Sequence, residues 1–494
     1  MKLNYKYWIL FILAILFNSC SDTLDVDLQG EYTKETFYKT KEEALFTLNA
    51  TYQICSFTST NNNLWVFGDI ASDDAIKGGN SGDLSDASYI NDFDVNSDNG
   101  QIEAIWKHYY EGIVRANNVI SYVPNIEMNE DLKQRIVGEA KFLRAYFYFN
   151  LTNIFGEIPL KTKPINNVKD LSVPVSSVED IYKQIEQDLT DAIAVLPISH
   201  DATDIGRATK GAAFGLLSKV YLFQENWKLA LDNADSVEQL GYSLMPIYSQ
   251  NFQISHQNNS ESIFEIQHLS AQSPALGSFL NQYFSPKPIG GYAFDAPTQN
   301  FVDEFEVIQD TIFDPRLDYT IVRSGKKWID GEDFDPAWSV SGYLTKKHAE
   351  PKAETPIIGD GNLNYVYMRF ADILLIKAEA LNELNRSAEA LVPLNKVRKR
   401  ARECYLFDNS LVGYGVIPDK LLTDITNTDK SYLKSAIRHE RRVELGFEFH
   451  RFFDLMRYGK NIAEQALNNT NFIYEQNRYF PIPQSEIDSN NQIN

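Results

Sequence analysis

The chain has 494 residues, of which 44% are hydrophobic, a share that supports a folded core and excludes a disordered chain. Lys and Arg number 46 against 67 Asp and Glu, so the net charge is −21. Nucleic-acid binding and electrostatic attraction to anionic lipid both need clusters of basic side chains. The charge balance therefore argues against both, while an aromatic share of 13% suggests stacking surfaces for neutral ligands.

The N-terminus has the pattern of a bacterial export signal. Lys2 and Lys6 precede an apolar run from Trp8 to Phe17, which is about half the ~20 residues needed to span a bilayer. The residues up to Cys20 resemble a lipobox, with Phe17 in place of the usual Leu. We predict removal of residues 1–19 and lipid attachment at Cys20, because several acyl chains would anchor the protein stably. An ordinary cleavage site with an incidental cysteine is the alternative.

The two remaining cysteines, Cys55 and Cys404, are far apart in the sequence. Disulfides are allowed outside the cytoplasm, but two distant cysteines do not make a disulfide framework. We therefore predict buried free thiols.

Apolar residues recur every three to four positions in several segments, which predicts helices. A capping box of Ser176 and Glu179 opens one of them, and Pro197 ends it. The segments are 131–156, 177–196, 207–224, 226–240, 370–384, 388–401 and a last set over 430–467. Paired helices of this length predict a mainly α fold, a tetratricopeptide-like scaffold of helix pairs with long irregular loops and a few short strands.

Two stretches interrupt the helices, at 57–101 and 246–365. Loops this long in a folded protein are usually functional or disordered, and their aromatic content favours order. We expect the ligand there. Despite these interruptions, a single large domain is predicted, with an N-terminal region at 20–245 and a C-terminal region at 246–494.

The most specific block of sequence lies near the C-terminus. It reads RHERRVELGFE at 438–448, then RFFDL at 451–455 with Arg457, and it closes on FPIPQSEI at 480–487. Further blocks in the same order as in a known family occur at 33–37 with 44–52, at 140–146 with 156–160, at 206–212 and at 369–383. Together they resemble the SusD/RagB-like surface lipoproteins of Bacteroidetes nutrient-uptake systems, over nearly the whole mature chain.

The resemblance implies a helical tetratricopeptide-like protein that packs on a SusC-like TonB-dependent transporter. It also implies a location at the outer membrane, held by the lipid and facing outside the cell. There such a protein captures extracellular ligands, most often oligosaccharides, without chemistry and without a cofactor. No ligand-binding motif of the family can be carried over residue by residue.

The charged residues of the C-terminal block are expected to stabilise the fold. Helix geometry brings Glu444 beside Arg441 and Glu448, so pairing must also reach neighbouring elements. Loss of one partner would leave an uncompensated charge. Acid–base catalysis by Glu440 or Glu444 is the alternative. The residues of this structural signature are Arg438, Glu440, Arg441, Glu444, Arg451, Asp454 and Arg457.

Carbohydrate capture needs flat apolar faces, which contribute ~25 cal/mol per Å² buried, and polar groups that satisfy hydroxyls. Burial under a loop is the alternative for each ring. We predict ring faces at Trp65, Tyr89, Phe93, Tyr283, Tyr292, Trp328 and Trp338, with Asp73, Asn80 and Arg323 as hydrogen-bonding partners.

One spacing is similar to a calcium-binding EF-hand loop. Its oxygen ligands would be Asp92, Asp94, Asn96, Asp98 and Glu103. Ser97 stands where that loop needs Gly for its sharp turn, so a solvated acidic loop is the preferred interpretation and no metal is predicted.

Enzyme activity is not predicted. The sequence has no HExxH spacing, no Gly-x-Ser-x-Gly elbow and no Gly-rich phosphate loop. A glycoside hydrolase needs two opposed carboxylates, and no motif singles out such a pair. Besides hydrolysis, the remaining alternative is a tetratricopeptide-like scaffold that binds only protein or peptide ligands.

Overall fold

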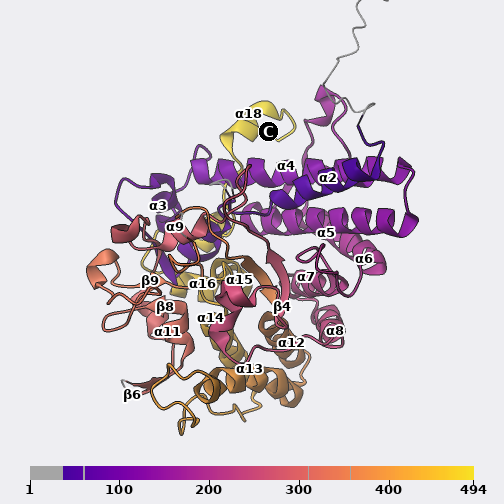
Figure 1. Cartoon of the computed structure of the whole chain (residues 1–494). Helices are drawn as coiled ribbons and strands as arrows, with labels where there is room; N and C mark the ends of the chain where they lie inside the picture. Colours follow the sequence, from indigo (N-terminus) through magenta and orange to yellow (C-terminus); the bar gives the residue numbers. More distant parts are fainter. Residues whose placement is uncertain (1–36, 59–61, 310, 356–357, 494) are drawn as a thin grey trace, which may run out of the picture.

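The computed structural model describes residues 37–58, 62–309, 311–355 and 358–493, and helices dominate it (Figure 1). The fold class is mainly α, as predicted. The longer helices are α2 (Lys41–Gln53), α4 (Gly100–Tyr122), α5 (Glu130–Phe155), α6 (Val178–Val195), α7 (Lys210–Phe223), α8 (Trp227–Glu238), α12 (Phe370–Glu383), α13 (Ser387–Phe407) and α14 (Lys430–Leu445).

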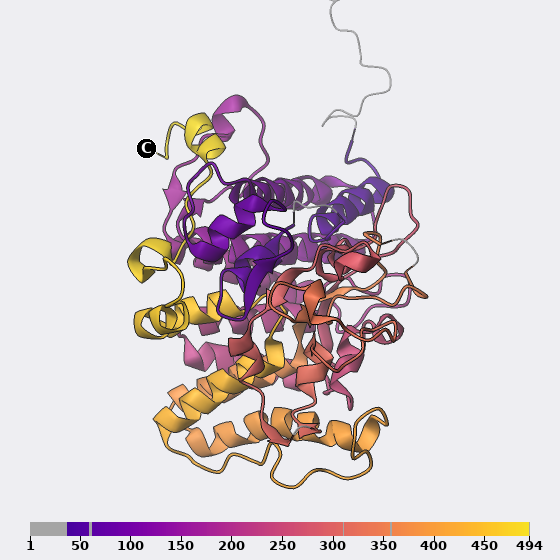
Figure 2. The same ribbon diagram turned by 90° about the vertical axis from the view of Figure 1, so that its left-hand side faces the viewer.

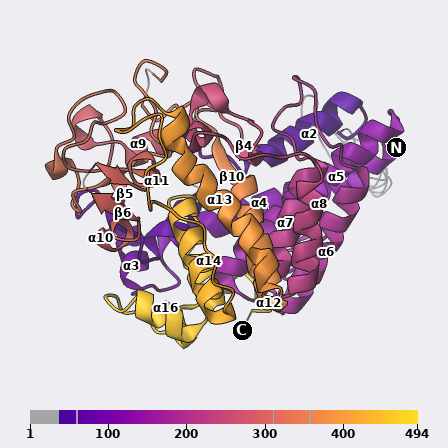
Figure 3. The same ribbon diagram turned by 90° about the horizontal axis from the view of Figure 1, so that it is seen from below.

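These helices pack in a continuous series. Helices α4 to α8 pack in chain order, each against the helix that follows it up to α8. Helix α8 then packs on α12, and α12 packs on α13 and α14. Seen from below, α12 to α14 lie beside α6, α7 and α8 (Figure 3). The chain thus leaves the series after α8 and rejoins it at α12, with the long second interruption between them.

The predicted helices agree with the structure within a few residues, with two differences. The N-cap of α6 is Ser177, whose side chain accepts from the backbone N–H of Asp180. Ser176 was the wrong choice because it pairs with Ile158 between β2 (Ile158–Pro159) and β3 (Val175–Ser176). The last set divides into α14, α15 (Arg451–Tyr458) and α16 (Lys460–Ala466), separated where Phe447, Phe449 and Gly459 adopt positive φ.

The two interruptions contain short elements. The first has η2 (Val66–Ile70), β1 (Ala75–Gly78) and α3 (Ser85–Asp92). The second has η5 (Tyr248–Phe252), η6 (Ile254–His256), β4 (Ser262–Ile266), α9 (Leu280–Phe284), η7 (Lys287–Ile289), β5 (Phe294–Pro297), α10 (Gln299–Val302), β6 (Val307–Gln309), β7 (Ile312–Phe313), α11 (Arg316–Thr320), β8 (Ile321–Val322), η8 (Pro336–Trp338) and β9 (Leu344–Thr345), and β10 (Tyr365–Arg369) leads into α12. The remaining elements are η3 (Val123–Asn125), η4 (Val168–Asp170), α17 (Tyr474–Asn477) and α18 (Gln484–Ser489).

The strands form antiparallel pairs only: β1 with β5, β4 with β10, β2 with β3, β6 with β7 and β8 with β9. The pair of β1 and β5 matters most for function, because it joins the two interruptions. Its register places Ala75 opposite Pro297 and Gly78 opposite Phe294. In Figure 1 these segments lie with α3 and α9 on the left side of the molecule, and Figure 2 turns that side toward the viewer.

The largest cluster of buried apolar side chains draws on both halves of the chain, from Ala44 to Phe480. Cys55 and Cys404 are buried free thiols, as predicted, whereas Cys20 lies outside the described residues. Within the described ranges, every helix is too short or too polar to cross a bilayer.

Candidate functional site

An exposed aromatic ring is backed by buried rings where the two interruptions meet. Tyr292 is 38% exposed and stacks on Phe294, with ring centroids 5.3 Å apart and planes at 13°. Phe294 in turn stacks on Trp65 at 6.1 Å, and Tyr283 lies 5.3 Å from Trp65. We call these four rings the aromatic platform. A ring held by such packing is pre-organised to receive an apolar ligand face.

A polar rim borders the platform, formed by the loop that follows β1 and by η7. Lys287 donates from Nζ to Oδ1 of Asn80 at 2.8 Å. Asn80 is in turn held by Asp83, whose Oδ2 accepts from its backbone N–H and its Nδ2. Lys77 Nζ donates to the carbonyl oxygens of Asn80 and Asp83 at 2.7 and 2.6 Å. The rim therefore holds the loop in one shape and leaves Lys287 exposed.

Gly79 connects rim and platform, and its substitution provides a test of this arrangement. Its φ is +64°, and a Cβ there would lie 2.4 Å from the ring of Phe294. We expect Gly79→Ala to lower the free energy of unfolding by about 1–2 kcal/mol, because both the backbone and the ring must shift. Urea denaturation measures the change. Gly82→Ala is the control, since its Cβ would meet nothing within 4 Å, and equal losses in both variants would contradict the close packing.

The structure brings some of the predicted ring faces together and buries others. Trp65, Phe93, Tyr283 and Trp328 are between 1% and 6% exposed, so in this structure they pack inside the protein and offer no open face. Trp338 is half-buried against Phe334. Only Tyr292 and Tyr89 among the predicted rings are exposed, and Tyr89, on α3, is 51% exposed.

Two of the three predicted hydrogen-bonding partners are engaged elsewhere. Asp73 accepts from Arg451 at 2.7 and 2.9 Å and lies 3.0 Å from Arg442. Arg323 pairs with Asp318 at 2.8 Å and lies over the ring of Phe313. These contacts are internal. Asn80 alone lies at the platform.

The calcium-like spacing is not assembled into a site. Within the described residues, no three His, Cys, Asp or Glu side chains lie close enough to hold a metal ion. Asn96 accepts from the backbone N–H of Asp98, and Glu103 pairs with Lys107 on α4. The side chains of Asp92, Asp94 and Asp98 are exposed, and they do not converge on a metal site.

The C-terminal signature forms a buried ion-pair network, as predicted. The two glutamates pair with arginines: Glu440 with Arg316 and Arg398, and Glu444 with Arg316, Arg369 and Arg400. The arginines pair with acids: Arg441 with Asp372 and Asp454, Arg451 with Asp73, and Arg457 with Glu379 and Asp454. Arg438 differs, because its guanidinium lies over the ring of Tyr458. Burial opposes ionisation of Glu444, but Arg400, Arg369 and Arg316 hold its pKa well below the ordinary value. A carboxylate held this way is a poor general acid or base at neutral pH.

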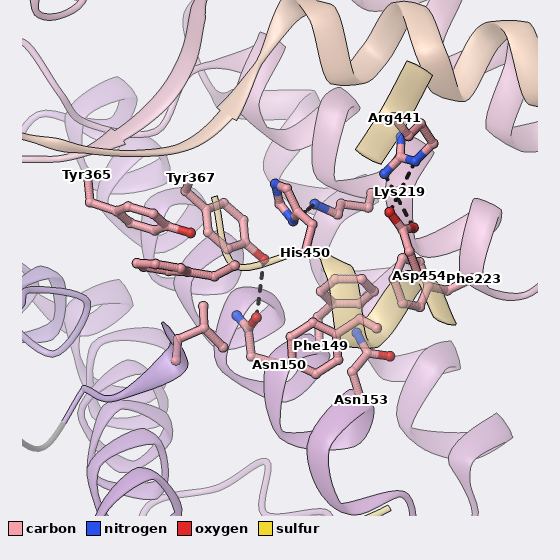
Figure 4. Close-up of a pocket in the computed structure, with 13 residues that line it drawn as sticks. Phe149, Asn150, Asn153, Lys219, Phe223, Tyr365, Tyr367, Arg441, His450 and Asp454 are labelled. Carbon is pink, nitrogen blue, oxygen red and sulfur yellow. Dashed lines mark hydrogen bonds and ion pairs between the residues drawn. The ribbon is translucent and has the colours of Figure 1, made fainter. Parts of the chain in front are cut away.

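A second polar cluster lines a small cavity between the helices (Figure 4). Lys219 Nζ lies 3.1 Å from Nδ1 of His450 and 3.3 Å from Oδ2 of Asp372. Burial and the charge of Lys219 lower the pKa of His450 to about 3, so its ring is neutral and accepts from the lysine. The cavity volume is about 10 Å³, room for no more than a single water. This cluster therefore stabilises the core and does not bind a ligand.

Sequence reasoning missed Phe294, Lys77 and Lys287. Phe294 is buried and reaches the site only through pairing of β5 with β1. A signal for the rim was present in the consecutive Gly78 and Gly79, since adjacent glycines mark a close backbone approach.

The comparisons with known proteins agree with this fold. Residues 33–222 match the family described as "Starch-binding associating with outer membrane", and residues 260–494 match the SusD family. The chain is 26% identical to SusD-like protein P2 of Formosa agariphila, over 99% of this chain and 98% of the relative. A solved structure named laminarin binding SusD-like protein is 28% identical, with a TM-score of 0.78 over 92% of this chain and 99% of its own. A SusD-like carbohydrate binding protein from Bacteroides fragilis has a TM-score of 0.80 at 24% identity, covering 93% and 100%.

A series of packed helices interrupted by long irregular segments is the fold that this chain shares with the SusD-like structures. The chain belongs to the SusD family.

Proposed function

We propose that this protein captures oligosaccharides outside the cell at the aromatic platform and passes them to a SusC-like TonB-dependent transporter. Lipid on Cys20 would hold it at the outer membrane, facing the exterior. The observation that carries the proposal is the exposed ring of Tyr292, stacked on buried Phe294 and bordered by a polar rim. A relative with 28% identity is named for binding laminarin, which supports a saccharide ligand.

Binding without chemistry suits this surface. The exposed ring can cover the apolar face of a sugar, and the rim contributes donors and acceptors for its hydroxyls. Two described acids beside the platform residues are engaged or buried, since Asp83 is bonded to Asn80 and Asp295 of β5 is fully buried. The relatives are named for binding and not for hydrolysis, which supports a capture protein.

Tyr292→Ala tests the proposal by isothermal titration with laminarin oligosaccharides and a panel of other glycans. A sugar that buries roughly 60 Å² of apolar ring surface gains about 1.5 kcal/mol, so we expect roughly tenfold weaker binding in the variant. Tyr432→Ala is the matched control, because Tyr432 is 50% exposed on α14, away from the platform. Lack of saccharide binding by the unmodified protein, with binding to peptides, would favour the protein-binding scaffold instead.

A further inference from the structure

The rim of the platform contains two lysines that lack carboxylate partners among the described residues. Lys77 is 7% exposed and its Nζ donates to two carbonyl oxygens. Lys287 is exposed and its Nζ donates to the amide oxygen of Asn80. An ammonium has three donors, so Lys287 keeps two for a ligand. Burial lowers the pKa of Lys77, the charge of Asp83 opposes that shift, and the second ammonium, on Lys287, adds to it.

The carboxylates near the rim do not cancel this charge. Asp83 carries one negative charge, and its Oδ2 is turned toward Asn80. Asp86, the next acid along α3, accepts from the backbone N–H of Gly100 at the start of α4. Asp295 lies beside Phe294 but is fully buried, and burial raises its pKa well above the ordinary value, which favours its uncharged form. Two positive charges therefore face one negative charge in a chain whose net charge is −21.

We propose that the ligand of the aromatic platform is an anionic glycan, whose uronate carboxylate or sulfate ester binds Lys287 while a sugar ring stacks on Tyr292. The inference rests on the proposed function and adds the chemical class of the ligand. A neutral glycan would offer the ammonium of Lys287 only uncharged hydroxyl oxygens as acceptors. An anion gains a charge-assisted hydrogen bond beside a second, buried ammonium.

The experiment compares three oligosaccharides of equal length: laminarin-derived, sulfated laminarin-derived and alginate-derived. Titration calorimetry at 50 and 500 mM NaCl measures each affinity. We expect at least one anionic ligand to bind about fivefold more tightly than the neutral one at low salt, with the difference shrinking at high salt. The sulfated and alginate arms distinguish a sulfate from a uronate.

Three variants assign the effect to the rim. Lys287→Gln should remove the preference for the anionic ligand, whereas Lys287→Arg should keep it. Lys169→Gln removes the same charge from an exposed position on η4 and should change neither affinity. Equal binding of all three ligands, or an anion preference that survives Lys287→Gln, would overturn this inference and leave capture at Tyr292 standing. If none of the three ligands binds, the anionic-glycan inference is overturned, and the proposed capture is overturned as well if the wider glycan panel also fails to bind.

Discussion

Replacing Glu444 with glutamine is expected to destabilise the protein by about 3–5 kcal/mol, since it leaves buried positive charge uncompensated. Glu444 is completely buried on α14, and its carboxylate bonds the guanidinium groups of Arg316, Arg369 and Arg400. These three arginines come from α11, from the end of β10 and from α13. One side chain thus connects the irregular second interruption to the helix series, and urea denaturation would measure its loss.

Glu389→Gln is the control for Glu444→Gln. Glu389 pairs with Arg386 at 2.6 Å, but the two side chains are 58% and 45% exposed, so we expect a loss below about 1 kcal/mol. Equal losses in the two glutamine variants would contradict a network role for Glu444.

The wild-type protein should also lose stability in acid. Burial opposes the ionisation of Glu448, but Arg369 and Lys347 lower its pKa to about 2 from the ordinary value of 4.5. The stability from Glu448 is therefore complete above pH 4.5 and is lost as the pH falls toward 2.

The sequence predicts only those ion pairs of this network whose partners lie close together along the chain. The alternation of Arg and Glu on one helix was enough to predict ion pairing for Glu440 and Glu444. It could not name Arg316 or Arg400 as partners, because these lie in other elements and meet α14 only in the folded chain. Local helix periodicity is visible in a sequence, whereas the packing of one helix against a distant segment is not.

The aromatic residues illustrate the same limit. Trp65 and Trp328 lie in segments without helical or strand periodicity, so their sequence surroundings do not distinguish a ring face from a buried side chain. In the structure, Trp65 packs beneath Phe294, and Trp328 packs with Phe334 and Leu344 in a separate small core. Long loops in folded proteins need cores of their own, and large rings supply them.

The platform itself is a product of long-range pairing. Asn80 follows β1 and Tyr292 precedes β5, and the antiparallel register of these strands brings the two residues to the same end. A ligand site in these two interruptions stays a prediction, and within them the register of β1 and β5 selects Tyr292 over the other rings.

Asp69→Asn is expected to have the opposite sign to Glu444→Gln and to stabilise the protein near neutral pH. Asp69 and Asp295 are fully buried, and neither carboxylate has a hydrogen-bond partner within the described residues. Burial first, and then the nearby Asp295 and Asp74, raise the pKa of Asp69 well above its ordinary value of 3.8, against the opposing charge of Lys347 and the nearby backbone N–H of Phe449. The segment η2 packs closely on the backbone of Phe449, whose carbonyl oxygen lies 2.3 Å from where a Cβ on Gly68 would stand.

The sign follows from proton binding in the two states. Above pH 3.8 the unfolded chain releases the proton of Asp69 while the folded protein keeps it, so stability falls as the pH rises, by about 1.4 kcal/mol per unit, until the folded pKa is reached. Asparagine has the same shape and no such proton. We therefore expect Asp69→Asn to match the wild type near pH 4 and to be more stable than the wild type at pH 7, measured by urea denaturation at both pH values.

Asp73→Asn is the matched control, four residues along the same segment. Burial opposes the ionisation of Asp73, but Arg451 and Arg442 hold its pKa below the ordinary value. This substitution should therefore destabilise the protein at pH 7, because it breaks the paired hydrogen bonds from Arg451. An Asp69→Asn variant that is less stable than the wild type at both pH values would show that the carboxylate is paired. The contrast between Asp69 and Asp73 depends on one feature of the fold, which is whether a guanidinium from the C-terminal signature reaches the buried acid.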